Sequence, residues 1–228
     1  MSPGRHSYGD DPAQYAELTL PDGEPRGVAV LVHGGFWKPE YGIEYARPLV
    51  PSLVGRGWAT WAIEYRRGTG AADTLADVRA AIDALPVGAG VVVGIGHSAG
   101  GHLATWAAAG GGLTHVVSQA GVLDLRAAYD DGLGGGAVER FLGRPPGPAD
   151  AGVDPVRMVP LGVPVWCVHG RDDDTVPVSQ SRAYVEAARA AGGAAELVEV
   201  EGDHFVVVDP DSDAWARTLA HLAGLSGG

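Results

Sequence analysis

Ser98 stands in the pattern Gly-x-Ser-x-Gly, a spacing that favours nucleophilic chemistry. The apolar run Val91-Val-Val93 precedes it and the alanine-rich residues 99–109 follow it, which predicts a strand, a turn and a helix. Such a turn lifts a serine hydroxyl above the edge of a sheet, and Gly96 and Gly100 remove side chains that would collide there. A serine also falls in a glycine-rich turn by chance in a chain with 36 glycines, so the assignment depends on what surrounds it.

A serine hydroxyl is a weak nucleophile and needs a base, which in turn needs an acid to hold it. Of the eight histidines, His204 suits the base because it follows the last predicted strand and precedes the last helix. His97 is expected to point away from Ser98. His102, on the helix predicted to follow Ser98, is the main alternative base. Structural roles are predicted for four histidines near strand ends: His33, His97, His102 and His169.

The acid is expected in the loop that follows a predicted strand, His169-Gly-Arg-Asp-Asp-Asp-Thr-Val-Pro177. Three aspartates in this loop are candidates for the acid. Asp173 is the predicted acid, and Asp172 and Asp174 are predicted to lie in a solvated turn. The chain order is then serine, aspartate, histidine, the order of the α/β hydrolases. No cluster with metal-ligand spacing accompanies the run, so no metal is expected.

Charge that develops on a carbonyl oxygen during attack needs backbone N–H donors. Ala99 would supply one, and Gly35 or Phe36 in the loop His33-Gly-Gly-Phe-Trp37 would supply another. Phe36 and Trp37 are predicted to wall the substrate pocket. For Trp37, packing in the core is the alternative.

The rest of the chain predicts one α/β domain over residues 1–228, with a mostly parallel sheet of about seven to eight strands and helices on both faces. The first strand is expected to lie antiparallel at an edge. Strands are predicted at residues 16–20, 28–32, 59–65, 91–95, 115–120, 163–168 and 196–200, and helices at 45–56, 74–85, 99–109, 179–191 and 213–222.

The least regular segment, residues 123–161, holds one short helix candidate at 137–142. Ligands bind beyond the carboxyl ends of the strands in open α/β sheets. Residues 124–161 are therefore predicted either to form a minimal cap over that crevice or to be a plain surface loop.

Composition excludes several classes of function. A formal charge of −12 with one lysine argues against a nucleic-acid partner. No apolar stretch approaches the length of a membrane span and no signal peptide is recognised, so a cytoplasmic protein without a membrane partner is expected. Cys167, the single cysteine, lies in an apolar run and is predicted to be a buried structural thiol.

Four ordered motifs together resemble the esterase/lipase type of the α/β-hydrolase superfamily: His33-Gly-Gly-Phe-Trp37, Gly96-His-Ser-Ala-Gly-Gly-His102, His169 to Pro177 and Gly202-Asp-His-Phe205. The His-Gly-Gly-x-Trp form is similar to the kynurenine formamidase (arylformamidase) branch. The resemblance implies the α/β-hydrolase fold and a triad of Ser98, Asp173 and His204. It also implies an oxyanion hole of Gly35 or Phe36 with Ala99.

The leading hypothesis is a cofactor-free serine hydrolase that cleaves a small carboxylic ester or aryl formamide through an acyl-enzyme. Its expected partner is a small-molecule substrate with a small, mostly apolar acyl group, and the chain is expected to be a monomer or a homodimer. The alternatives are an acyltransferase or lyase on the same scaffold, a small peptidase, and a binding module without catalysis.

Overall fold

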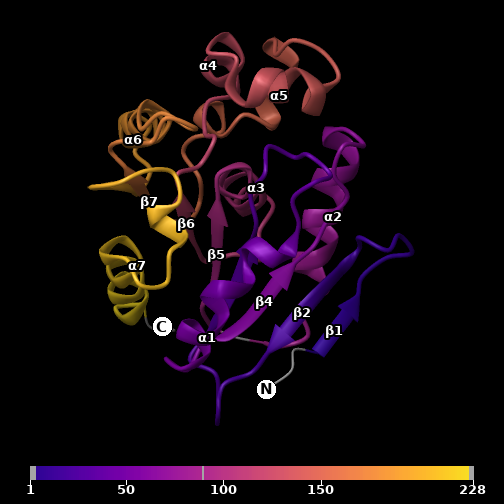
Figure 1. Ribbon diagram of the computed structural model, residues 1–228, viewed down its shortest axis with the longest axis vertical. Coiled ribbons are helices and arrows are strands. Elements are labelled where there is room, and N and C mark those ends of the chain that lie inside the picture. Colours follow the sequence, from indigo (N-terminus) through magenta and orange to yellow (C-terminus); the bar gives the residue numbers. More distant parts are fainter. Residues whose placement is uncertain (1–3, 89, 226–228) are drawn as a thin grey trace.

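The computed structural model describes residues 4–88 and 90–225 and contains one eight-stranded sheet in the order β1-β2-β4-β3-β5-β6-β7-β8 (Figure 1). β1 and β2 pair antiparallel, β2 pairs antiparallel with β4, and the other neighbours are parallel. The strands are β1 Gly4–Ser7, β2 Tyr15–Thr19, β3 Val28–Val32, β4 Ala59–Ile63, β5 Val92–His97, β6 His115–Gln119, β7 Val165–Gly170 and β8 Ala195–Val200.

Helices alternate with these strands along the chain. The α-helices are α1 Val50–Val54, α2 Ala71–Asp83, α3 Ala99–Ala108, α4 Leu125–Asp130, α5 Leu133–Leu142, α6 Ser179–Ala190 and α7 Asp213–Ala223. Short 3₁₀ turns are η1 Ile43–Tyr45, η2 Arg47–Leu49, η3 Pro148–Gly152, η4 Pro155–Arg157 and η5 Val206–Val208. None of the described helices is both long and apolar enough to cross a membrane.

The sheet is covered on both faces, as its apolar central strands require. Every residue of β3 and β4 is buried, which suits strands packed between two layers of helices. One apolar layer takes side chains from α2, α3 and α6, and the other takes side chains from α1 and α7. The predicted α/β-hydrolase architecture is confirmed.

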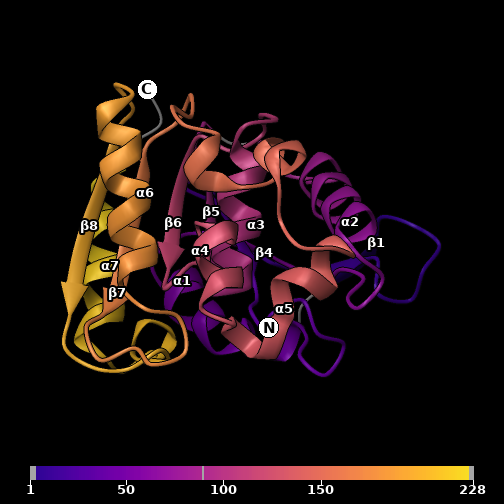
Figure 2. The same cartoon turned by 90° about the horizontal axis from the view of Figure 1, so that it is seen from above.

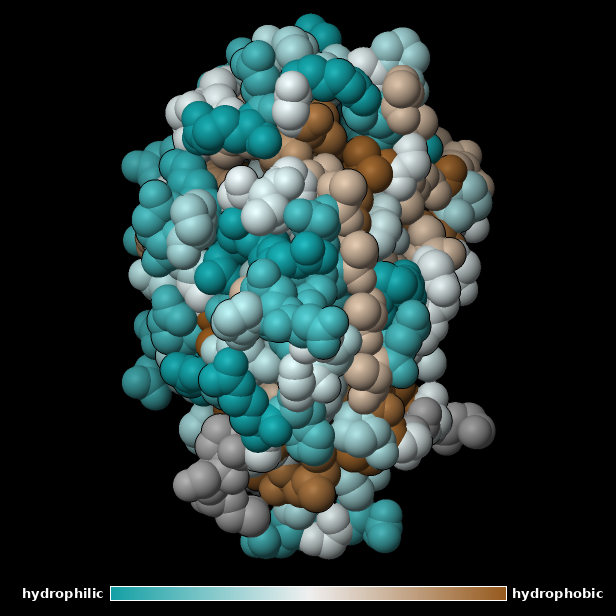
Figure 3. All heavy atoms as spheres, turned by 90° about the vertical axis from the view of Figure 1, so that its right-hand side faces the viewer, coloured by the Kyte–Doolittle hydropathy of each residue, from teal (hydrophilic) through white to brown (hydrophobic). Residues whose placement is uncertain are grey.

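The antiparallel edge differs from the prediction by one strand. β1 occupies the edge and the predicted first strand, now β2, lies between β1 and β4. β1 has no apolar run of its own. It is held at the edge by pairing with β2 and by the Arg5 guanidinium, which lies 3.6 Å from the Tyr15 ring centre. The face that carries this edge is mainly hydrophilic, with small separate hydrophobic patches (Figure 3), as a protected sheet edge should be.

The connection between β6 and β7 holds more structure than predicted: α4, α5, η3 and η4. The Asp124 side chain caps α4 by accepting a hydrogen bond from the Ala127 N–H. Gly134, Gly135 and Gly136 have φ between 59° and 83°, so right-handed helix within α5 begins near the predicted residue 137. α4 and α5 lie at the end of the molecule toward which β4 and β5 point (Figure 1), and in front of α3 when seen from above (Figure 2).

Candidate active site

Ser98 lies at the junction of β5 and α3, in a backbone conformation that few residues other than glycine adopt. Its φ is 55° and its ψ is −120°, and its exposed fraction is 2%. A Cβ on Gly96 would overlap the carbonyl of Gly100, and a Cβ on Gly100 would overlap the carbonyl of Val32. The two glycines of the motif are therefore required by close backbone contacts. Strain of this kind persists only where the surrounding packing holds it, and it is frequent at active sites.

The donor loop, residues 33–37 after β3, lies directly beside the elbow, the turn that carries Ser98, because β3 and β5 are neighbours in the sheet. A Cβ on Gly34 would stand 2.9 Å from the Ser98 Cβ. Gly35 and Phe36 have φ of 111° and 51°. Within the described residues, the N–H groups of Gly35 and Phe36 donate no hydrogen bond, and the Ala99 N–H is at the first position of α3, where no intrahelical partner exists. These N–H groups can therefore bind an oxygen from a ligand.

The predicted acid and base meet although they are 31 residues apart. The Oδ2 atom of Asp173 lies 2.6 Å from Nδ1 of His204. Its Oδ1 atom accepts hydrogen bonds from the N–H groups of Thr175 and Val176 at 2.9 and 2.8 Å. Burial acts to raise the pKa of Asp173, but hydrogen bonds from His169 and His204 outweigh it and hold that pKa well below its usual range. Asp173 is thus a carboxylate that fixes one ring nitrogen of His204 and leaves Nε2 for chemistry.

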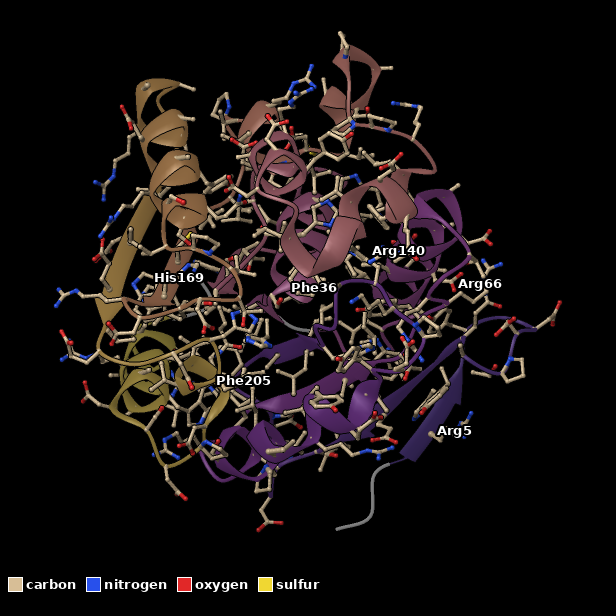
Figure 4. The ribbon with its side chains drawn as sticks, turned by 45° about the horizontal axis from the view of Figure 1, so that its top comes forward. Arg5, Phe36, Arg66, Arg140, His169 and Phe205 are labelled. Carbon is tan, nitrogen blue, oxygen red and sulfur yellow. The ribbon has the colours of Figure 1, made fainter. Side chains whose placement is uncertain are left out.

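Ser98 and His204 line one cavity of about 200 Å³. Figure 4 shows Phe36 and Phe205 near each other at this site, one from the loop after β3 and the other from the loop after β8. The lining residues are Gly34, Gly35, Phe36, Tyr41, Tyr45, His97, Ser98, Thr175, His204 and Phe205. The cavity therefore joins a serine, a histidine held by a carboxylate, and two glycines of the donor loop.

His97, predicted to be structural and to point away from Ser98, lines the cavity of Ser98 and packs against His204. Its Nε2–H donates to the carbonyl of His204 at 3.0 Å, and the two ring centres are 4.5 Å apart. Residues alternate between faces along a strand, so His97 shares a face with Val93 and Ile95, and the loop that carries His204 crosses that face. Burial lowers the pKa of His97 to about 3, so the ring braces His204 as a neutral group.

Three other histidines have the predicted structural roles. His33 contacts the Gly34 carbonyl and Glu64 behind the donor loop. His169 bonds to the Val176 carbonyl at 2.8 Å, in the loop of Asp173. His102 donates to the Val153 carbonyl at 2.8 Å and does not line the cavity of Ser98.

Trp37 does not line the cavity of Ser98. Its ring is 3% exposed, stacks on Phe141 of α5 with centres 4.3 Å apart, and meets His102 edge-on at 5.2 Å. Trp37 therefore fills the space between α3 and α5, which was the alternative to substrate contact.

Four residues of the cavity were not predicted: Tyr41, Tyr45, Thr175 and Phe205. Three of these are large hydrophobic side chains with unusual exposure: Tyr41 at 38%, Tyr45 at 50% and Phe205 at 58%. Phe205 directly follows the predicted base, which was a usable signal. Tyr41 and Tyr45 reach the site through the turn at η1, and no pattern in the sequence marks that turn.

The remaining predictions concern groups outside the cavity. Cys167 is fully buried, and burial raises its pKa to about 12, as expected of a structural thiol. Asp172 and Asp174 are exposed, in agreement with a solvated turn. Within residues 4–88 and 90–225, no group of three His, Cys, Asp or Glu side chains is arranged to hold a metal ion.

Comparison with known proteins gives relatives that are esterases. The chain is 27% identical over 219 residues to esterase LipC of Mycobacterium tuberculosis, covering 80% of this chain and 54% of the relative. It thus spans about half the length of that curated relative. Among solved structures, Thermogutta terrifontis esterase 2 phosphoramylated by tabun has a TM-score of 0.79 at 25% identity, covering 97% of this chain and 92% of that one. A truncated carbohydrate esterase from gut microbiota has a TM-score of 0.81 at 17% identity, covering 96% of this chain and 94% of that one, and shows the shared fold.

The family match covers most of the chain. Residues 52–223 match the prolyl oligopeptidase family, Peptidase_S9, a span that includes Ser98, Asp173 and His204. This match does not show the formamidase branch that the His-Gly-Gly-x-Trp motif resembles. The chain belongs to the prolyl oligopeptidase family and has the α/β-hydrolase fold of its esterase neighbours.

Proposed function

We propose that this chain is a serine hydrolase that cleaves small carboxylic esters through an acyl-enzyme on Ser98. The observation that carries the proposal is one cavity in which Ser98, at a positive φ, faces the same space as a histidine tied to a buried carboxylate. Ser98 is the nucleophile, His204 the general base and Asp173 the acid that sets the tautomer of His204.

The reaction would proceed in two halves. Nε2 of His204 takes the proton of the Ser98 hydroxyl as its oxygen attacks the substrate carbonyl, and the oxyanion accepts hydrogen bonds from Ala99 N–H and from Gly35 or Phe36 N–H. The tetrahedral intermediate collapses, the bond to the leaving group breaks, and His204 returns the proton to that group. Water then attacks the acyl-enzyme with the same base and releases the carboxylic acid.

The substrate is proposed to carry a short acyl group. A cavity of about 200 Å³ offers little room beyond the reacting ester. Structures of the related Thermogutta esterase are described with propionate and with butyrate bound, at 26% and 25% identity, which supports a similar acyl size here. An aryl formamide, which the His-Gly-Gly-x-Trp motif favours, has a still smaller acyl group, formyl, and is the first alternative within this class.

A peptidase is the second candidate function because the matched family is named for oligopeptidases. A peptide would need room on both sides of the scissile bond, and the cavity of about 200 Å³ at Ser98 offers little. The ester proposal therefore has priority, and the two classes are separated by assay.

The test replaces Ser98 by alanine. Hydrolysis of p-nitrophenyl acetate should fall by about 10⁴-fold or more, while labelling by a fluorophosphonate should disappear and the circular dichroism melt should be retained. Ser118→Ala is the matched control, because Ser118 is also buried and its hydroxyl has no partner within the described residues. A Ser98→Ala protein that kept its rate would overturn the proposal.

Substrate class is decided by comparing wild-type kcat/KM for four substrates in parallel: p-nitrophenyl acetate, p-nitrophenyl butyrate, N-formylkynurenine and a proline p-nitroanilide peptide. Highest efficiency on the esters is expected. A product trapped on a non-water acceptor, in preference to free acid, would indicate an acyltransferase.

A further inference from the structure

A second cavity lies beside the cavity of Ser98, against the connection between β6 and β7. The second cavity has a volume of about 250 Å³, and its lining includes Phe36, Trp37, Lys38, Arg140 and Phe141. Among the residues that the structure describes, Phe36 alone lines both cavities. In Figure 4 Phe36 lies between Phe205, at the cavity of Ser98, and Arg140, at the second cavity.

The Phe36 ring is held in this place by the cap. A Cβ on Gly134 would stand 2.7 Å from the Phe36 Cγ, so the ring rests against a bare glycine Cα. The Arg140 guanidinium donates to the carbonyls of Gly134 and Gly135 at 2.9 and 2.6 Å and so fixes the glycine turn. Lys38 Nζ lies 5.7 Å from the ring centre. The aromatic wall is therefore supported by residues about a hundred positions away in the sequence.

The second cavity has apolar walls and a polar, positively charged side. Trp37 and Phe141 supply aromatic surface. The Trp37 Nε1–H is buried and has no hydrogen-bond partner within the described residues. No carboxylate among residues 4–88 and 90–225 lies within 4.0 Å of Lys38 or Arg140. An apolar chain that ends in a carboxylate matches this lining.

We propose that Phe36 sets the upper limit on acyl length by closing the cavity of Ser98 off from the second cavity, which takes the distal part of a longer acyl group, preferably one with a terminal carboxylate, only when the ring is removed. This inference rests on the proposed esterase function, because the acyl group must first reach Ser98. The ring keeps the wild-type enzyme selective for short acyl groups, and its removal joins the two cavities.

The test measures a ratio of substrates, so that a general loss of activity does not imitate the result. For Phe36→Ala, the ratio of kcat/KM for p-nitrophenyl octanoate over p-nitrophenyl acetate should rise about tenfold or more, since each buried methylene contributes roughly a fourfold gain. Phe36→Leu, which keeps an apolar wall of intermediate size, should give a smaller rise. The backbone N–H at position 36 remains in both variants.

The charged side of the cavity is tested with a monoester of a dicarboxylic acid. In the Phe36→Ala background, Lys38→Gln should lower the ratio of p-nitrophenyl adipate monoester to octanoate by about threefold or more, as expected when a cation that meets a carboxylate is removed. An unchanged ratio would remove the preference for a terminal carboxylate from the proposal.

Two outcomes separate this inference from the proposed function. If wild-type protein hydrolyses no ester and takes up no fluorophosphonate, the proposed function fails. If wild-type protein hydrolyses acetate, but both Phe36 variants fold, are labelled by fluorophosphonate and keep the wild-type octanoate-to-acetate ratio within twofold, Phe36 is not the partition and this inference alone is overturned.

Discussion

Glu64 is predicted to be the residue whose removal most destabilises the loop beside Ser98. Its exposed fraction is 5%, and its two oxygens serve four partners. Oε1 lies 3.0 Å from Nε2 of His33 and accepts from the Tyr65 N–H at 2.8 Å, while Oε2 accepts from the Ile43 N–H at 2.9 Å. The Arg67 guanidinium forms an ion pair with the same carboxylate. One side chain thus joins the start of the donor loop to the turn that carries Tyr45.

The size of the effect follows from what Glu64→Ala would leave behind. Two buried N–H groups would lose their acceptor, and the largely buried Arg67 would lose its counter-charge. Removal of one partner from a buried ion pair costs about 3–5 kcal/mol. In a domain whose whole free energy of unfolding is about 5–15 kcal/mol, this is a large fraction. At about 2–4 °C per kcal/mol for a chain of this size, the melting temperature should fall by about 6–20 °C.

The measurement is urea unfolding followed by tryptophan fluorescence, with a thermal melt in parallel. Glu64→Gln, which keeps an acceptor oxygen but no charge, should cost less, about 1–3 kcal/mol. Glu201→Ala is the control, because its ion pair with Arg171 involves a Glu201 side chain that is 80% exposed, and such pairs contribute about 0–1 kcal/mol. The reasoning would be refuted by a Glu64→Ala protein within about 1 kcal/mol of wild type.

Two further predictions test the site and its packing. Asp173→Asn should lower kcat by about 10⁴-fold. Because the folded-state pKa of Asp173 is below its ordinary value, its contribution to stability is present above the ordinary carboxyl pKa and is lost as the pH falls through the lower value. The variant should therefore lose stability less steeply than wild type as the pH falls from about 5 to about 2, as measured by urea midpoints; a parallel pH dependence would contradict the assignment. Gly100→Ala should lower the free energy of unfolding by about 3 kcal/mol, because the new Cβ would overlap the Val32 carbonyl. Gly147→Ala is the control, because a Cβ there meets open space and should change the urea midpoint little. Equal midpoints for the two variants would show that the turn at Ser98 relaxes freely.

The parts of the fold that the sequence predicted are those with strong local patterns. The strand at Val28–Val32 has the predicted bounds because its unbroken apolar run suits a strand covered on both faces. β1 was missed because its residues, Gly-Arg-His-Ser, carry no alternation and its pairing partner supplies the order. α4 was missed although Asp124, three residues before Ala127, is a good N-cap, because a helix of six residues has too little periodicity to detect.

The proposed triad could be placed from the sequence for a geometric reason. Parallel strands end at one edge of the sheet, so residues directly after β5, β7 and β8 must gather there whatever their separation in the chain. Ser98, Asp173 and His204 are such residues. The same logic, extended to the alternation of faces along β5, would have placed His97 beside His204.

The order of the strands does not place the residues around the substrate pocket. For this reason the sequence predicted that Phe36 and Trp37 form the same wall. Both residues have positive φ, at 51° and 55°, but their surroundings are set by the connection between β6 and β7. Phe36 meets Gly134 and Trp37 meets Phe141, about a hundred residues later, and neither contact follows from the order of strands. Ser98, Asp173 and His204 follow strands of the sheet, whereas Phe36 and Trp37 take neighbours from the connection between β6 and β7. Relatives that share the elbow and the donor loop should therefore differ in acyl preference according to what their β6–β7 connection places against the residue at position 36.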